Sequence, residues 1–158
     1  MRNRAKAGLV AAVALMAAGV PGDVASQGTG AEAAMVAAGE WVRGRLPAGS
    51  VRLDPHRTGR STDRAVAARV ASALGAELGT LEQSRACADV ADPSTCRLDV
   101  AVLLAIAEPA IRGDRAVVRA YAWYRQNDPR SPVGKGSWEV TLRRTASGWA
   151  VEGEQRLD

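Results

Sequence analysis

Apolar and polar residues alternate with period two along the last sixty residues of the chain, Leu98 to Leu157. Gly, Pro, Asp or Asn bound each alternating run, which is typical of antiparallel strands joined by short turns. The segment Leu98–Ala107 is apolar on both of its faces, so it is expected to be a central strand. The pattern predicts three further strands, at 116–125, 138–143 and 149–152, of which the last two have one buried face.

Two helices are expected before this sheet, at 31–46 and at 63–84. The apolar stripe of the first comprises Met35, Val42 and Leu46, and that of the second comprises Val66, Val70, Leu74, Leu78 and Leu81. Gly75 and Gly79 fall inside the second helix, where they indicate the close approach of another backbone. A short strand is expected at 50–54. The sequence predicts an α+β fold with two N-terminal helices packed on a mostly antiparallel sheet of four main strands.

The first residues have the pattern of a secretory signal peptide. Arg2, Arg4 and Lys6 precede an apolar run, 7–20, and small residues follow at 24–26. We therefore expect a signal peptide at 1–26, a Gly-rich spacer at 27–30 and a single α+β domain at 31–158. The protein is expected to be exported, to the periplasm or the extracellular space. No other segment approaches the length of a membrane-spanning helix.

Charge and cysteine content narrow the possible partners. The chain has 21 basic and 17 acidic residues. Without residues 1–26, which hold three basic residues and Asp23, the counts become 18 and 16, a net charge of +2, so no nucleic-acid partner is expected. Cys87 and Cys96 form an even pair in an oxidising compartment, which predicts one intramolecular disulfide. Two cysteines and a distant histidine are too few for a metal site, and neither a metal nor a cofactor is expected.

The segment 54–64 contains the only histidine, His56. Asp54, His56, Ser61 and Asp63 could supply a base, an orienting group and a nucleophile, but closeness in sequence is not the geometry that nucleophilic catalysis needs. We favour a structural interpretation, in which Ser61 or Thr62 caps the next helix and Asp63 lies in its first turn. No catalytic residue is assigned.

Gly113 and Asp114 suit a two-residue hairpin turn between strands, although with Arg112 they also spell an integrin-type tripeptide. A strict two-residue turn would pair Leu104 with Trp123, and a change of register by one residue would move the aromatic side chains to the other side. If Val118, Ala120 and Ala122 point into the core, Tyr121 and Trp123 stand on the opposite face. Core packing of these two aromatics is the alternative.

The last strands resemble those of nuclear transport factor two-like proteins, the cystatin-like α+β cone. The resemblance rests on the turn Gly113–Asp114 and on the closing hairpin, residues 138–144 and 147–151, and the preceding order of helix, short strand and long helix is also similar. The resemblance implies a curved antiparallel sheet wrapped around helices, often with a pocket. The superfamily includes isomerases, dehydratases, ligand binders and interaction modules, so the fold does not decide the function.

Three functions follow as hypotheses. The first is a non-enzymatic module that binds a small ligand or a protein; the second is an isomerase- or hydrolase-type enzyme with a pocket in the cone; the third is a structural envelope protein that dimerises through the sheet. Aromatic residues beside arginine are enriched at binding interfaces. The candidate ligand- or partner-binding residues are Asp99, Arg119, Tyr121, Trp123, Glu139 and Arg143.

Overall fold

The computed structural model describes residues 24–56, 63–89, 91–92, 95–130 and 132–158, with side chains from Gly30 onward. The helices are α1 (Val24–Arg43), α2 (Arg64–Ala73) and α3 (Leu81–Ser84). The strands are β1 (Val51–Leu53), β2 (Glu77–Leu78), β3 (Arg85–Cys87), β4 (Cys96–Leu98), β5 (Val102–Ile106), β6 (Ala110–Arg112), β7 (Arg115–Arg125), β8 (Val133–Thr145) and β9 (Gly148–Arg156). No helix of these residues is long and apolar enough to cross a membrane.

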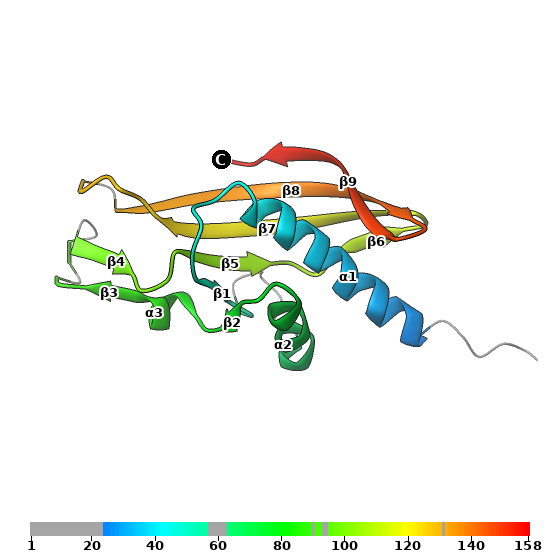
Figure 1. Ribbon diagram of the computed structural model, residues 1–158, viewed down its shortest axis with the longest axis horizontal. Coiled ribbons are helices and arrows are strands. Elements are labelled where there is room, and N and C mark those ends of the chain that lie inside the picture. The colour runs from blue at the N-terminus through cyan, green and yellow to red at the C-terminus, as the bar shows by residue number, and fades with distance from the viewer. Residues whose placement is uncertain (1–23, 57–62, 90, 93–94, 131) are drawn as a thin grey trace, which may run out of the picture.

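A seven-stranded sheet forms the body of the molecule (Figure 1). Its strand order is β2-β1-β5-β7-β8-β9, with β6 also paired to β7. β1 runs parallel to β2 and β5, and every pair from β5 to β9 is antiparallel. β3 and β4 form a separate two-stranded ribbon. The expected α+β class and the mostly antiparallel sheet are confirmed, but the sheet has more than the expected four strands.

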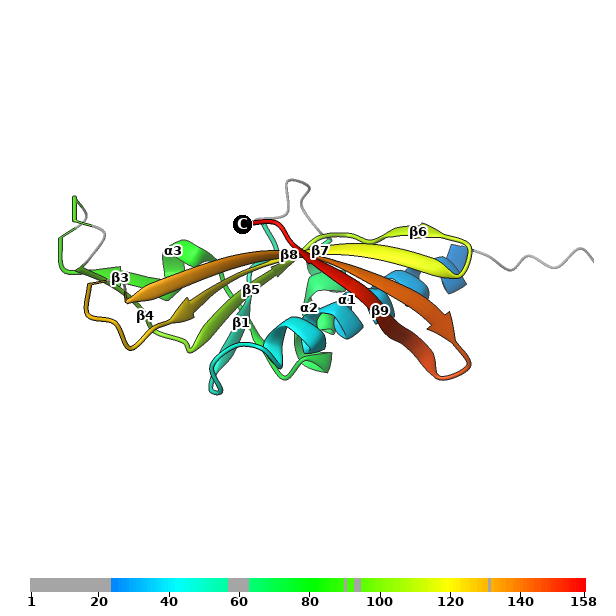
Figure 2. The same cartoon turned by 90° about the horizontal axis from the view of Figure 1, so that it is seen from above.

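Helices α1 and α2 lie on one side of the sheet, which we call the inner face (Figure 2). Its buried residues are Val51, Leu53, Val102, Leu104, Ile106, Ala116, Val118, Ala120, Ala122, Trp138, Val140 and Leu142. The alanines of β7 leave room for α1 to approach the sheet closely. Gly39 marks this approach, because an added Cβ would lie 2.7 Å from Ile106 Cδ1 and 2.8 Å from Leu74 Cδ1.

Helix α1 starts earlier than the first expected helix. It begins at Val24, so it includes the residues expected at the signal cleavage site and in the spacer 27–30. It ends at Arg43, just before Gly44. Residues 1–23, which carry the basic and apolar parts of the expected signal peptide, lie outside the described residues. The signal peptide, its cleavage and the single-domain division remain predictions.

The expected long helix at 63–84 was wrong, because α2 ends at Ala73. Gly75 has a φ of 60°, a left-handed conformation that favours glycine, and the Ala76 N–H donates to Ala71 O as in a Schellman cap. The chain then forms β2 and the short α3, so the apolar stripe spans three elements. Gly79 lies against the side chain of Arg52 rather than another backbone, since its added Cβ would lie 2.3 Å from Arg52 Cδ.

The predicted turn at Gly113 and Asp114 fits the structure, where Arg112 pairs with Arg115. The expected first strand, 98–107, however, covers only the end of β4 and the whole of β5. One extra residue enters between β5 and β6 near Pro109, which has no N–H to donate to a ladder. Leu103 therefore pairs with Trp123, and Leu104 pairs with Ala122. This register difference of one residue places the aromatic side chains opposite the inner face.

The predicted disulfide joins Cys87 and Cys96 across β3 and β4. Arg85 Nη2 also donates to Cys96 Sγ over 2.9 Å. The bridge closes a short loop between two strands. It pins the ribbon whose Leu98 packs against Leu103 of the main sheet. A disulfide of this kind is typical of an oxidising compartment.

Candidate binding face

The side of the sheet away from α1 and α2, here called the outer face, carries five of the six candidate residues. Residues paired directly across antiparallel strands point to the same side. Leu103, Trp123 and Lys135 form one such row, Ala105, Tyr121 and Ser137 the next, and Arg119 pairs with Glu139 in the third. Two further rows are Val117 with Thr141 and Arg115 with Arg143. The structure thus brings Arg119, Tyr121, Trp123, Glu139 and Arg143 together on one surface.

Ion pairs neutralise part of this surface. Arg119 Nε lies 3.1 Å from Glu139 Oε2, a cross-strand pair between opposed residues of β7 and β8. Arg143 Nη2 lies 3.0 Å from Glu152 Oε1, and Arg115 Nε lies 3.2 Å from Glu152 Oε2. These arginines remain half or more exposed, so each pair adds little to stability. The guanidinium groups stay accessible to a partner.

Asp99, the sixth candidate residue, has a structural contact. Both of its carboxylate oxygens lie 3.0 Å from Arg52 Nη1, which also donates to Ser84 Oγ over 2.8 Å. The Asp99 N–H donates to Ser84 O. Arg52 is largely buried, with a side chain 16% exposed. Asp99 thus joins β1, α3 and the β4–β5 connection, and its carboxylate is already engaged.

The two aromatic candidates have different surroundings. Trp123 is half-buried against a second apolar cluster, formed by Leu81, Leu98, Val100 and Leu103 with Val133. Tyr121 is also half-buried, but it belongs to neither apolar cluster of the described residues. The same holds for Val117. Trp123 therefore anchors the ribbon to the sheet, whereas Tyr121 and Val117 are partly exposed apolar side chains of β7 outside both clusters.

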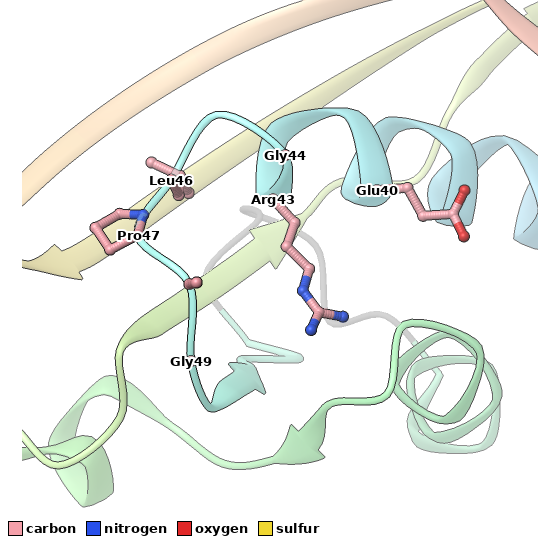
Figure 3. Close-up of a pocket in the computed structure, with 7 residues that line it drawn as sticks. Glu40, Arg43, Gly44, Leu46, Pro47 and Gly49 are labelled. Carbon is pink, nitrogen blue, oxygen red and sulfur yellow. The ribbon is translucent and has the colours of Figure 1, made fainter.

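A shallow pocket of about 370 Å³ lies between the C-terminal end of α1 and the chain leading to β1 (Figure 3). It is lined by Glu40, Arg43, Gly44, Leu46, Pro47, Ala48 and Gly49. Arg43 Nη1 donates to Leu74 O over 2.5 Å, where it closes the end of α2. None of the six candidate residues lines this pocket.

The segment with His56 has structural contacts in its described part. Asp54 is buried, and its carboxylate accepts the backbone N–H of His56 at 2.9 Å and that of Leu81 at 2.9 Å. Asp63 is itself the N-cap of α2 and accepts from the Ala65 N–H, so the expectation that it lies in the first turn was wrong. Ser61 and Thr62 lie outside the described residues. Asp54 therefore binds backbone groups rather than the imidazole in these contacts.

The resolved pKa shifts lie away from the outer face. A side-chain hydrogen bond from Arg69 lowers the pKa of Glu32 against the opposing effect of its burial, and joins α1 to α2. At the C-terminus, a hydrogen bond from the Ser137 N–H and one from Arg156 lower the pKa of Asp158. Within the described ranges no cluster of three or more His, Cys, Asp or Glu residues could hold a metal ion.

Sequence reasoning missed three residues of this surface: Arg52, Arg112 and Arg115. The partner of Arg52 depends on the parallel β1–β5 pair, for which the sequence contains no local signal. Arg112 and Arg115 could have been found, because the two-residue turn at Gly113 and Asp114 places them side by side.

Comparison with protein-family models, with curated proteins and with solved structures found no match to this chain. The resemblance to the cystatin-like α+β cone stays a prediction.

Proposed function

We propose that the protein is an exported, non-enzymatic interaction module that binds a protein partner through the outer face of its sheet. Export is inferred from the sequence pattern of residues 1–26 and is supported by the disulfide between Cys87 and Cys96. The outer face is the surface on which five of the six candidate side chains meet.

The position of Tyr121 carries this proposal. An aromatic side chain in the middle of a sheet usually packs in a core or against a partner, because its large apolar area gains most from leaving water. Tyr121 is half-buried and belongs to neither apolar cluster of the described residues. Val117 lies on the same face of β7, beyond the Arg119–Glu139 ion pair, and also belongs to neither cluster. Partly exposed aromatics bordered by arginine are typical of partner-binding surfaces.

A binding site in a pocket has less support. The pocket at the end of α1 is shallow, and Arg43 beside it is engaged in holding α2. The inner face, where a pocket of the cone type would lie, is filled by side chains of α1 and α2. These observations favour the outer face over a pocket as the place where the candidate residues bind a partner.

Site-specific photo-crosslinking in the native host tests the proposal. Tyr121 is replaced by p-benzoylphenylalanine in one variant, and exposed Ala68 on α2 is replaced in a matched control. Because only the outer face contacts the partner, illumination should produce a defined adduct of higher mass from position 121 and none from position 68.

Two results would contradict the proposal. Adducts of equal yield from both positions would indicate random encounter, and no adduct from position 121 would indicate that the outer face has no stable partner. An adduct with twice the mass of one chain would identify a second copy as the partner, as in the dimer hypothesis.

A further inference from the structure

Three arginines form a row across one end of the outer face. Arg112 of β6 pairs directly with Arg115 of β7, and Arg115 pairs directly with Arg143 of β8. Directly paired residues lie on the same side of a sheet, and neighbouring strands are about 4.8 Å apart. The three side chains therefore leave the outer face at adjacent points. Figure 2 shows these strands together at the end of the sheet near the start of α1.

The row has more positive than negative charge. Glu152 forms ion pairs with both Arg115 and Arg143. The Arg112 side chain is exposed and forms no ion pair or hydrogen bond with any residue that the structure describes. Asp114 lies in the adjoining turn. Like charges directly opposed in a sheet are unfavourable, so this end of the face gains from an added anion.

We propose that this arginine row binds the carboxylates of an acidic segment of the partner protein, which lies along β7 toward Tyr121. The inference rests on the proposed function and specifies the chemistry of the partner. Glu152 shows how a carboxylate fits: it accepts from two guanidinium groups at 3.0 to 3.3 Å. Arginine recognises carboxylates through its planar set of N–H donors.

The geometry favours a polypeptide over a membrane. The row and Tyr121 stand on the same face and on the same strand, six residues apart along β7, which is roughly 20 Å. An extended segment of similar length contacts both, with carboxylates at the arginine row and apolar side chains at Val117 and Tyr121. A lipid surface would offer phosphates to the row, and binding to vesicles distinguishes it in the test below.

Binding to labelled poly-L-glutamate tests the inference on the mature protein with its disulfide intact. We expect saturable binding that weakens with added salt and moves the Nε–H resonances of Arg112, Arg115 and Arg143 in NMR spectra. Arg112→Glu should weaken binding about tenfold, because it removes the unneutralised guanidinium and adds a repelling charge. Arg130→Glu makes the same charge change outside the outer face and should change the affinity less than about twofold.

Three outcomes would overturn the inference. These are no binding of poly-L-glutamate, equal weakening by Arg112→Glu and Arg130→Glu, and Arg112-dependent binding to phosphatidylglycerol vesicles without binding to poly-L-glutamate. The crosslink from position 121 separates this failure from that of the proposed function. If only the inference is wrong, the adduct persists in the Arg112→Glu background; if the proposed function is wrong, no adduct forms in either background.

Discussion

The two faces of this sheet carry different kinds of side chain from the same strands. Along β7, Ala116, Val118, Ala120 and Ala122 point to the inner face and are fully buried, while the residues between them point to the outer face and stay partly exposed. The inner side chains are small because two helices press against them. The outer side chains are larger and mix charge with aromatic groups. Packing therefore explains the inner residues, and the outer residues are the ones that the proposed function assigns to a partner.

The contrast between the two faces requires that most of the outer face is not part of the core. At one end, the β3–β4 ribbon covers the outer face and makes it part of the core. Replacing both Cys87 and Cys96 by Ser should lower the free energy of unfolding by about 2 to 3 kcal/mol, because the denatured chain loses a short closed loop. Urea melts measure the loss, and melts of the reduced wild type are the control. Labelling of both thiols in the denatured, unreduced protein would contradict the disulfide.

Trp123 tests the boundary between core and binding face. It packs against Leu98 and Leu103 but is only half-buried, so Trp123→Ala should cost about 2 kcal/mol. That value lies between the 3 to 5 kcal/mol of a fully buried tryptophan and the roughly 0.5 kcal/mol of a surface residue. Tyr121→Ala is the matched variant and should cost less than about 1 kcal/mol. Equal losses in urea melts would remove the distinction between the two aromatics.

The smallest expected effect concerns the helices that cover the inner face. Arg69 lowers the pKa of Glu32 in the folded state, so this ion pair stabilises the protein above the pKa of the unfolded chain. The contribution is lost as the pH falls through the lowered, folded-state pKa. Wild type should therefore exceed Glu32→Gln in stability at pH 6, and the small difference should vanish at strongly acidic pH. The exposure of Arg69 keeps the effect small. A difference that grows on acidification would contradict the assignment.

Sequence periodicity predicted the elements whose partners are near in sequence. β7, β8 and β9 follow one another through hairpins, and of the two placements that the sequence left open, the structure has Val118, Ala120 and Ala122 in the core. The second helix was overestimated because Leu78 and Leu81 continue its apolar spacing, although Gly75 ends it. The parallel pairing of β1 with β5 depends on contacts about fifty residues apart, for which local patterns carry no information. The alternation of residue types predicted the candidate face. The ion pairs on that face could be identified only from the register of the paired strands.

The neighbouring valines of β7 test most directly the claim that the two faces have separate roles. Val117 points to the outer face and Val118 to the inner face, where it is fully buried. Val118→Ala should lower stability by about 2 kcal/mol, through two lost methyl groups and a cavity, and should leave the crosslink from position 121 intact.

Val117→Asp should do the reverse, with a stability loss below about 1 kcal/mol and no crosslink, because the charge repels an acidic partner and replaces an apolar side chain of the outer face. Urea melts and crosslinking of the same two variants give both readouts. The account predicts this double dissociation. If the crosslink persists in the Val117→Asp variant, or if that variant is unfolded, the outer face is not a free binding surface.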